Sequence, residues 1–553
     1  MKLLNHRFFM LSGLTLAVSA CTTLPRAPEV VLAEPNLPLE VSYDTPVDNV
    51  STVSTPTMPS LAATRWQDFY ADEKLKALIE LGLANNKNLE QATLAIQKAA
   101  AQYQISSIQN VPTLGSNAGY TRSGNTNTSA GSYNVGLGLS NYEFDLWGRV
   151  SSLKEQALQG YLATSAAKDS LQISLISNIA QSYANISYAK AQMILAQSTV
   201  KSRERSLYIT QRRFTAGIDS KSPSLQAESS LEGARLAVME AETNLLKAQN
   251  ALELLIGAPV PAELMPEPAI TSLVTPTVLN AGLPSELLYY RPDIAQAEYA
   301  LKAAGANINV ARAAFFPTIS LSGNLGVSSP SLNNLFNSNG LGWNFGPSIS
   351  LPIFDAGARR ANYEVAEIEQ KQALSAYEAA IQTAFKEVRD VLAGRMHLEE
   401  QVATQYRLQK NYQQTYNIAY ATFRSGLSNY LDVLDAERSL FAAQQNILQL
   451  ELQKVISQIQ LYQALGGGAV LDAAQITSEA EQSAAMTAAR LATAEEMAAL
   501  SDSDAKSLKP VAAPVMPATP EVPVATPVPE TAEPKTISVT PADGTDSPPT
   551  VSP

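Results

Sequence analysis

The sequence predicts a mainly α-helical chain with a few paired β-strands, and three observations predict it. Two long stretches, residues 145–214 and 357–423, contain no proline and very few glycines. Two pairs of short segments alternate apolar with small polar residues, and the second half of the chain repeats the first half block by block. Together these features predict a tandem duplication in which each copy holds two strands and a very long helix.

The two copies align at offsets of 205 to 210 residues, in the same order along the chain. The matching blocks are Pro112-Thr113-Leu114 with Pro317-Thr318-Ile319, Asn134, Gly136, Phe144 and Asp145 with Asn344, Gly346, Phe354 and Asp355, and Phe214, Gly217 and Ala227-Glu228 with Phe423, Gly426 and Ala436-Glu437. Apolar residues or alanines recur every three and four positions upstream of the first block in both copies, and again over residues 231–255, as in packed helices. We therefore expect a first repeat over residues 65–280 and a second over 281–468, neither of them an independent domain.

The N-terminus has the pattern of a bacterial secretory signal. Positive residues precede an apolar stretch over 8–20 that is too short to cross a bilayer as a helix. The stretch ends in Val18-Ser19-Ala20-Cys21, which resembles a lipobox, where the cysteine sulfur receives a diacylglycerol and the signal is cut before it. The alternative is an ordinary signal with a chance cysteine. Because Cys21 is the only cysteine of the chain, we expect a lipoprotein signal peptide over 1–20 and a Cys21 that carries diacylglycerol and palmitate.

Proline-rich segments flank the predicted body of the protein. Residues 21–64 read as an extended linker behind the lipid anchor, and no aspartate follows Cys21, which in bacterial lipoproteins favours export to the outer membrane. At the other end, twelve prolines fall within the last 44 residues. This composition buries too little apolar surface to offset the entropy of ordering, so we expect a disordered tail over 469–553.

Composition excludes several classes of function. The formal net charge of −12 argues against a nucleic-acid partner held through phosphates. With one cysteine and two histidines, His6 and His397, the chain offers no disulfide framework, no thiolate or imidazole metal site and no Cys/His catalytic pair. No nucleotide-binding loop or catalytic constellation stands out either. We expect a protein that is not an enzyme and holds no cofactor or metal ion.

The alternating segments predict strands at about 113–121 and 133–144 in the first copy and 318–328 and 342–354 in the second. One face is apolar and the other small and polar, over about ten residues, as in a lipid-facing strand around a wet lumen. A half-buried strand of a soluble sandwich gives the same alternation. The helices favour the first interpretation, because continuous helices over about 146–214 and 357–423 would each be roughly 100 Å long. Four strands cannot close a barrel, so the chain is expected to form oligomers.

Several motifs together resemble the outer-membrane factor (TolC-like) family. They are Leu288-Tyr289-Tyr290-Arg291-Pro292-Asp293, Ala311-Arg312-Ala313-Ala314-Phe315-Phe316-Pro317, Phe144-Asp145-Leu146-Trp147-Gly148-Arg149, Leu351-Pro352-Ile353-Phe354-Asp355 and Tyr430-Leu431-Asp432-Val433-Leu434-Asp435. The resemblance covers about residues 65–468 and implies a homotrimer with a twelve-stranded outer-membrane barrel, four strands from each protomer, continued by a periplasmic helical tunnel. The lipobox points to the lipid-anchored branch of this family.

The implied function is passive. The chain would be the outer-membrane channel of a tripartite efflux system, exporting small molecules, drugs above all, that an RND-type inner-membrane pump delivers through a periplasmic adaptor. Protein secretion and metal efflux use the same scaffold, and the absence of Met/His clusters leans against a dedicated copper or silver channel. A structural coiled-coil lipoprotein of the envelope is the rival from another class, but it leaves the paired strands of both halves unexplained.

The sequence also indicates two regions of functional interest. Two tight turns end the long helices, Thr215-Ala216-Gly217 and Arg424-Ser425-Gly426, and the resemblance places them at the periplasmic end that meets the adaptor. Just after the second turn, Asp432 and Asp435 are three residues apart and share one face of a helix. The resemblance implies a periplasmic gate of paired aspartate rings here, with Leu427 and Phe423 as apolar and aromatic constrictions. The alternative is that Asn429 caps this helix with Asp432 in its first turn.

Overall fold

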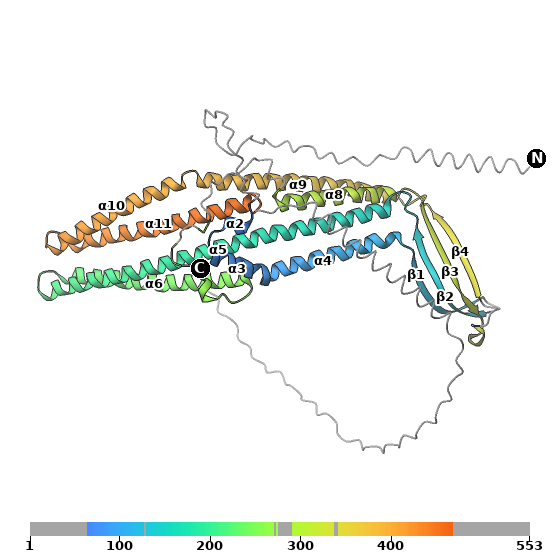
Figure 1. The fold of residues 1–553 in the computed structure, drawn as a ribbon, viewed down its shortest axis with the longest axis horizontal. Helices are drawn as coiled ribbons and strands as arrows, with labels where there is room; N and C mark the ends of the chain where they lie inside the picture. The colour runs from blue at the N-terminus through green and yellow to red at the C-terminus, as the bar shows by residue number, and fades with distance from the viewer. Residues whose placement is uncertain (1–63, 126–128, 270–272, 275–289, 337–340, 468–553) are drawn as a thin grey trace, which may run out of the picture. The chain divides into compact units, whose positions relative to one another are not determined.

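The computed structural model describes residues 64–125, 129–269, 273–274, 290–336 and 341–467. All the structure discussed below belongs to one unit of the chain, Met1–Ile476. The predicted signal peptide, all but the last residue of the linker and the predicted tail lie outside the described residues. Figure 1 shows the described elements of this unit. The strands lie at one end of the helices, and the turns that join α5 (Arg149–Thr215) to α6 (Lys221–Ile256) and α10 (Leu398–Arg424) to α11 (Tyr430–Ala464) lie at the other.

The strands form one four-stranded antiparallel sheet with the order β1-β2-β3-β4. They span Thr113–Gly124, Ser129–Glu143, Thr318–Ser329 and Leu341–Ser350, so β2 and β3 join the two copies of the duplication. The prediction that the fourth strand runs to residue 354 was wrong. The strand ends at Ser350, where the pairing of β3 with β4 also ends, at Thr318 opposite Ser350.

The register of the sheet gives it one polar face and one mostly apolar face, and the second face also carries Ser116, Arg122 and Ser329. Ser132 and Ser328 lie within hydrogen-bonding distance across β2 and β3, as do Ser320 and Ser348 across β3 and β4, which places these hydroxyls on one face. The other members of this polar face are Thr113, Gly115, Asn117, Gly119, Thr121, Asn134, Gly136, Gly138, Thr318, Ser322, Asn324, Gly326, Gly342, Asn344, Gly346 and Ser350. The opposite, apolar face carries Leu114, Tyr120, Tyr133, Val135, Leu137, Leu139, Ile319, Leu321, Leu325, Val327, Leu341, Trp343, Phe345 and Ile349.

In each copy an aspartate lies between the end of a strand, β2 or β4, and the start of the long helix that follows it. Asp145 accepts hydrogen bonds from the backbone N–H groups of Val150 and Ser151, at 3.0 and 2.8 Å, at the start of α5 (Arg149–Thr215). Its counterpart Asp355 accepts from the N–H groups of Gly357 and Arg359 at the start of α9 (Ala358–Arg395). These carboxylates satisfy backbone donors that have no partner within the helix. The repeated Phe-Asp motif is therefore a helix cap.

The first long helix is continuous, whereas the second is interrupted, which corrects the prediction of one helix over 357–423. Here α9 ends at Arg395 and α10 (Leu398–Arg424) begins after Met396 and His397. Gly394 lies in the last turn of α9, with open space where its side chain would be, so this turn has low helix propensity and little packing to hold it. After the interruption Leu398 is buried again, at 3% exposure.

The remaining helices pack along these long ones. They are α2 (Trp66–Phe69), α3 (Glu73–Asn85), α4 (Lys87–Ser107), α6 (Lys221–Ile256), α8 (Pro292–Ala313) and α11 (Tyr430–Ala464), with short 3₁₀ turns at Ile108–Asn110, Ala262–Leu264 and Leu332–Asn334. The predicted 3-4 seam of α6 is buried at Leu231, Ala234, Ala241 and Leu252. Its alanines let α6 lie close to α5. No described helix has a stretch apolar and long enough to cross a membrane.

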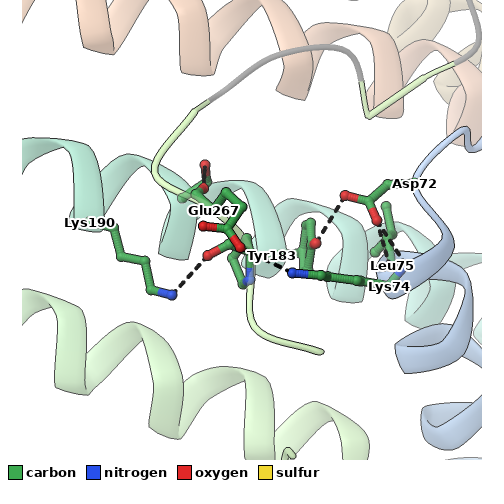
Figure 2. A network of polar contacts seen from close by, with 8 residues as sticks. Asp72, Lys74, Leu75, Tyr183, Lys190 and Glu267 are labelled. Carbon is green, nitrogen blue, oxygen red and sulfur yellow. Dashed lines mark hydrogen bonds and ion pairs between the residues drawn. The ribbon is translucent and has the colours of Figure 1, made fainter. Parts of the chain in front are cut away.

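The largest hydrophobic core of the described residues lies midway along the helices. It joins segments from the beginning and the end of the described chain, from Phe69 to Leu465. The rings of Phe69 and Tyr462 stack with their centroids 4.0 Å apart, so α2 is held against the end of α11. Close by, the Tyr183 hydroxyl donates to Asp72 at 2.9 Å, and Lys190 donates to the Pro266 carbonyl oxygen at 2.8 Å (Figure 2). These contacts fix α3 and the segment after α6 on the middle of α5.

Candidate functional site

The helices end in two turns of the same construction, one joining α5 to α6 (the first hairpin) and one joining α10 to α11 (the second hairpin). At the first tip, Gly217 has a φ of 70° and Ile218 N–H donates to the Arg213 carbonyl at 2.9 Å. At the second tip, Gly426 has a φ of 75° and Leu427 N–H donates to the Thr422 carbonyl at 2.9 Å. Both are Schellman motifs, which use glycine because a side chain disfavours positive φ.

The predicted tip residues are all exposed. Thr215, Ala216 and Gly217 at the first tip, and Arg424, Ser425 and Gly426 at the second, face away from the packed helices. The apolar residue after each glycine usually packs back on its own helix. Here Ile218 is 63% exposed and Leu427 is 81% exposed. Each tip therefore presents an uncovered apolar side chain.

Arg213 links the two tips, and the sequence analysis did not single it out. Its guanidinium forms an ion pair with Asp219 across the first turn, at 2.6 Å. The same group lies over the ring of Phe423 in the second hairpin, 4.9 Å from the ring centroid. The opposite charges of Arg213 and Asp219 on either side of the first turn could have indicated the ion pair from the sequence. The contact with Phe423 could not be predicted in this way, because it joins residues 210 positions apart. Only the packing of the two hairpins reveals it.

Phe423 does not face outward, which corrects its expected place as an aromatic constriction. It is 3% exposed and belongs to a small core between the hairpins, together with Ala227, Tyr430, Val433 and Leu434. Its side chain is therefore part of the packing inside one protomer. Of the two constriction residues expected from the sequence, Leu427 alone is exposed.

Asp432 and Asp435 both lie on the exposed side of the first turns of α11. Asn429 is the N-cap of this helix, and its side-chain oxygen accepts a hydrogen bond from the Asp432 N–H at 3.2 Å. The capping interpretation of Asn429 is therefore confirmed. Asp435 lies one turn further on and makes no part of that cap, so the cap leaves the pairing of the two exposed carboxylates unexplained.

The polar face of the sheet is a second candidate surface. A hollow of about 280 Å³ on it is lined by asparagines from all four strands, Asn117, Asn134, Asn324 and Asn344. Within the strands as described, the one charged side chain on this face is Glu143. It forms an ion pair with Arg149 at 2.6 Å, at the end of the sheet that adjoins the helices. A surface of hydroxyls, amides and glycines can line water without selecting one sign of charge.

The remaining expectation, lipid on Cys21, falls outside the described residues. In the part of the chain that is described, no three His, Cys, Asp or Glu side chains come together as metal ligands would.

Comparison with known proteins adds three findings. The family model described as outer membrane efflux protein matches residues 78–258 and 283–467. The chain is 40% identical over 409 residues to the cation efflux system protein CusC of Escherichia coli strain K12, covering 73% of this chain and 88% of that protein. It is 38% identical over 412 residues to the antibiotic efflux pump outer membrane protein ArpC of Pseudomonas putida, covering 73% of this chain and 85% of that protein.

A solved structure extends the likeness to the fold. The open state of the MtrE outer membrane channel of Neisseria gonorrhoeae matches with a TM-score of 0.72 and 36% identity, over 80% of this chain and 98% of that one. The two segments matched by the family model correspond to the two copies of the internal duplication.

Proposed function

The chain belongs to the outer membrane efflux protein family, and we propose that it is the passive outer-membrane conduit of a tripartite system that exports small molecules. In this system an RND-type pump of the inner membrane supplies the energy, and a periplasmic adaptor joins the pump to the conduit. Relatives of this chain are named as proteins of efflux systems, and the energy for export would come from the partner pump.

The observation that carries the proposal is the division of the sheet into two faces. The apolar face suits contact with lipid, and the polar face suits a water-filled lumen. Strands β1 and β4 leave two open edges in one protomer, and unpaired backbone groups are not tolerated in a bilayer. Further copies of the chain would pair these edges, and the family resemblance sets their number at three, which gives a closed barrel of twelve strands in a homotrimer.

The opposite end of the helices suits a docking role. The exposed apolar side chains of Ile218 and Leu427 stand at equivalent positions of the two tips, and exposed arginines precede both, Arg212 and Arg424. An apolar side chain left in water at both copies of a duplicated turn is a candidate for burial by a partner. We assign this end to the adaptor, and the paired carboxylates of Asp432 and Asp435 to a gate just inside it.

Cys21 would hold the N-terminus at the outer membrane through its acyl chains. More than one chain makes such anchoring durable. The protein would thus be attached to the membrane twice, by its strands and by its lipid.

The substrate is proposed to be a class of small organic molecules, drugs and solvents. A specific observation favours a second candidate, metal cations, because the relative of 40% identity is named for cation efflux. Ten methionines and two histidines in the whole sequence form no evident cluster, which favours the first candidate. The conduit would receive what the partner pump delivers, so the pump would decide between them.

The test is complementation. A strain lacking its own outer-membrane efflux channel would express this chain, and growth would be measured on a panel of drugs and of copper and silver salts, with each pump gene deleted in turn. Restored resistance that depends on one RND-type pump supports the proposal and names the substrate. No restored resistance to any compound, despite normal trimers in the outer membrane, would contradict it.

The docking assignment has its own variant. Arg424→Glu reverses an exposed charge at the second tip and should lower resistance without lowering the amount of protein. Arg407→Glu is a matched control, because Arg407 is an exposed arginine of the same helix well away from the tip. Equal resistance in the two variants would reject the tips as the docking surface.

A further inference from the structure

A group of buried polar side chains lies between the two hairpins, close to the tips. Its members are buried side-chain atoms that make no hydrogen bond of ordinary geometry with a described residue. They are Arg203 Nε and Ser206 Oγ in α5, Ser230 Oγ in α6, and Tyr430 OH and both carboxylate oxygens of Glu437 in α11. Buried polar groups are nearly always paired, so a cluster of unpaired ones at one seam calls for a function.

Glu437 is the acidic member of this group, and its carboxyl group can change its charge with pH. It is 5% exposed, and it follows Tyr430 by two helical turns on the same side of α11. The groups around it come from every helix packed here. They are Ser202 and the cationic Arg203 from α5, Tyr416 from α10, Tyr430 from α11 itself, and Ser230 of α6, whose carbonyl accepts a hydrogen bond from Arg203 Nη1 at 2.6 Å.

An ionised carboxylate is poorly accommodated in this seam. Neither carboxylate oxygen accepts a hydrogen bond of ordinary geometry from a described group, although the Ser202 hydroxyl lies close enough to favour the ionised form. Arg203 directs one of its N–H groups to the Ser230 carbonyl instead. Burial raises the pKa of Glu437, and Arg203 and Ser202 offset only part of this effect. The neutral acid is therefore the form that suits the packed hairpins.

The internal duplication supplies a natural comparison. The Ala436-Glu437 pair of α11 aligns with Ala227-Glu228 of α6. Ala227 is buried like Ala436, but Glu228 is exposed to solvent. The same dipeptide thus places one carboxylate in water and the other in the seam between hairpins, and only the second can respond to the packing of the hairpins.

We propose that Glu437 is a proton-linked latch: in its neutral form it lets α11 stay packed on α5, and its ionisation favours separation of the two hairpins. This inference rests on the proposed channel, because separation at this end would widen the periplasmic entrance. The packed state binds the proton more tightly than a separated state in which water reaches Glu437. Acid therefore favours packing, and rising pH favours separation, by at most about tenfold per pH unit for each protomer.

The direct test is hydrogen exchange of the full-length trimer in lipid nanodiscs between pH 5 and 8.5, corrected for intrinsic exchange rates. The amides of residues 202–210 and 430–440 should exchange faster as pH rises in the unmodified protein. Glu437→Gln mimics the neutral acid and should keep them slow throughout, whereas Glu228→Gln should behave like the unmodified protein. Arg203→Gln removes the nearby positive charge and should move the change to higher pH.

A pH profile that is unchanged by Glu437→Gln would overturn the latch. A profile of opposite sign would also overturn it, since that result means an ionised Glu437 paired with Arg203 holds the hairpins together. Conductance in planar bilayers then tests the link to the channel. The open fraction should rise with pH in the unmodified protein and become flat in Glu437→Gln. Loss of conductance in every variant, with the exchange profile intact, would reject the channel while leaving the latch standing.

The exposed aspartates need a separate control, because they titrate at the same end. Asp432→Asn combined with Asp435→Asn should keep the pH-dependent exchange of the seam. If the double variant abolishes it and Glu437→Gln does not, the pH response belongs to the exposed pair and the latch is wrong.

Discussion

The guanidinium of Arg213 lies over the ring of Phe423, and its Nη1 is 3.5 Å from the Phe423 carbonyl oxygen. Arg213 lies in the last turn of the long helix of the first copy, and Phe423 lies in the aligned region of the second copy. One side chain thus braces its own turn through Asp219 and holds the neighbouring turn through a cation–π contact and a carbonyl group. The two tips are mechanically joined within one protomer.

Replacing Arg213 should loosen both tips together. Arg213→Ala removes the ion pair, the ring contact and the carbonyl contact, and we expect local opening to become easier by about 1–2 kcal/mol, which is roughly 5–30-fold faster amide exchange. Hydrogen exchange of residues 213–219 and 422–427 would measure it. The control is Arg212→Ala, because Arg212 is exposed and lies over Tyr208 of its own helix. Equal effects from both variants would mean that Arg213 does not join the tips.

Arg291 should be required for stability and not for transport itself. Its side chain is 9% exposed, pairs with Asp293 and Glu387 at 2.7 Å each, and donates to the Ala464 carbonyl oxygen at 2.8 Å. Arg291→Ala leaves the Ala464 carbonyl oxygen without its donor, whereas the carboxylates of Asp293 and Glu387 are 34% and 47% exposed and can be hydrated. We therefore expect a destabilisation of about 1–3 kcal/mol. Lys302→Ala, which removes an exposed i,i+4 pair with Glu298, should change stability by less than about 1 kcal/mol. Chemical denaturation followed by circular dichroism compares the two, and similar midpoints would contradict the assignment.

The paired aspartates should determine the ion selectivity of the channel. In the proposed trimer, Asp432 and Asp435 place carboxylates near a common axis, and these attract cations and repel anions. We expect a small cation-selective pore that divalent cations inhibit. Asp432→Ala combined with Asp435→Ala should abolish both properties while Asn429 still caps α11. The measurement is the reversal potential in a salt gradient. An unchanged value in the double variant would reject the gate and leave only the capping contact between Asn429 and Asp432.

The lipid anchor is tested by one substitution. Cys21 is the sole cysteine of the chain, so Cys21→Ser should stop incorporation of labelled palmitate, leave the signal uncleaved by the lipoprotein peptidase and weaken retention in the outer membrane. Equal labelling of the variant and the unmodified protein would show that the acyl chains are attached elsewhere.

Features that depend on the spacing of residues close together in the sequence could be predicted without the structure. Alternation with a period of two requires neighbouring side chains to face opposite sides of a strand, so the two faces of the sheet could be predicted before any pairing was known. The 3-4 seam of α6 and the glycine at each tip were predictable for the same reason, because helix packing and positive φ are local demands. The cap at Asn429 belongs to this group as well.

Only the tertiary structure decided what lies between the hairpins. Phe423 and Leu427 are both apolar and only four residues apart, yet one is buried and the other is exposed, because the first hairpin covers one side of the second. Glu437 and Glu228 follow the same dipeptide pattern, and their opposite burial depends on which side of each helix meets α5. The interruption of the second long helix at Met396 and His397 was not predicted either, although Gly160 lies within the continuous α5 much as Gly394 lies within α9. Burial is a property of the neighbours that a residue meets in space, and a local sequence pattern contains no information about which distant helix those neighbours come from.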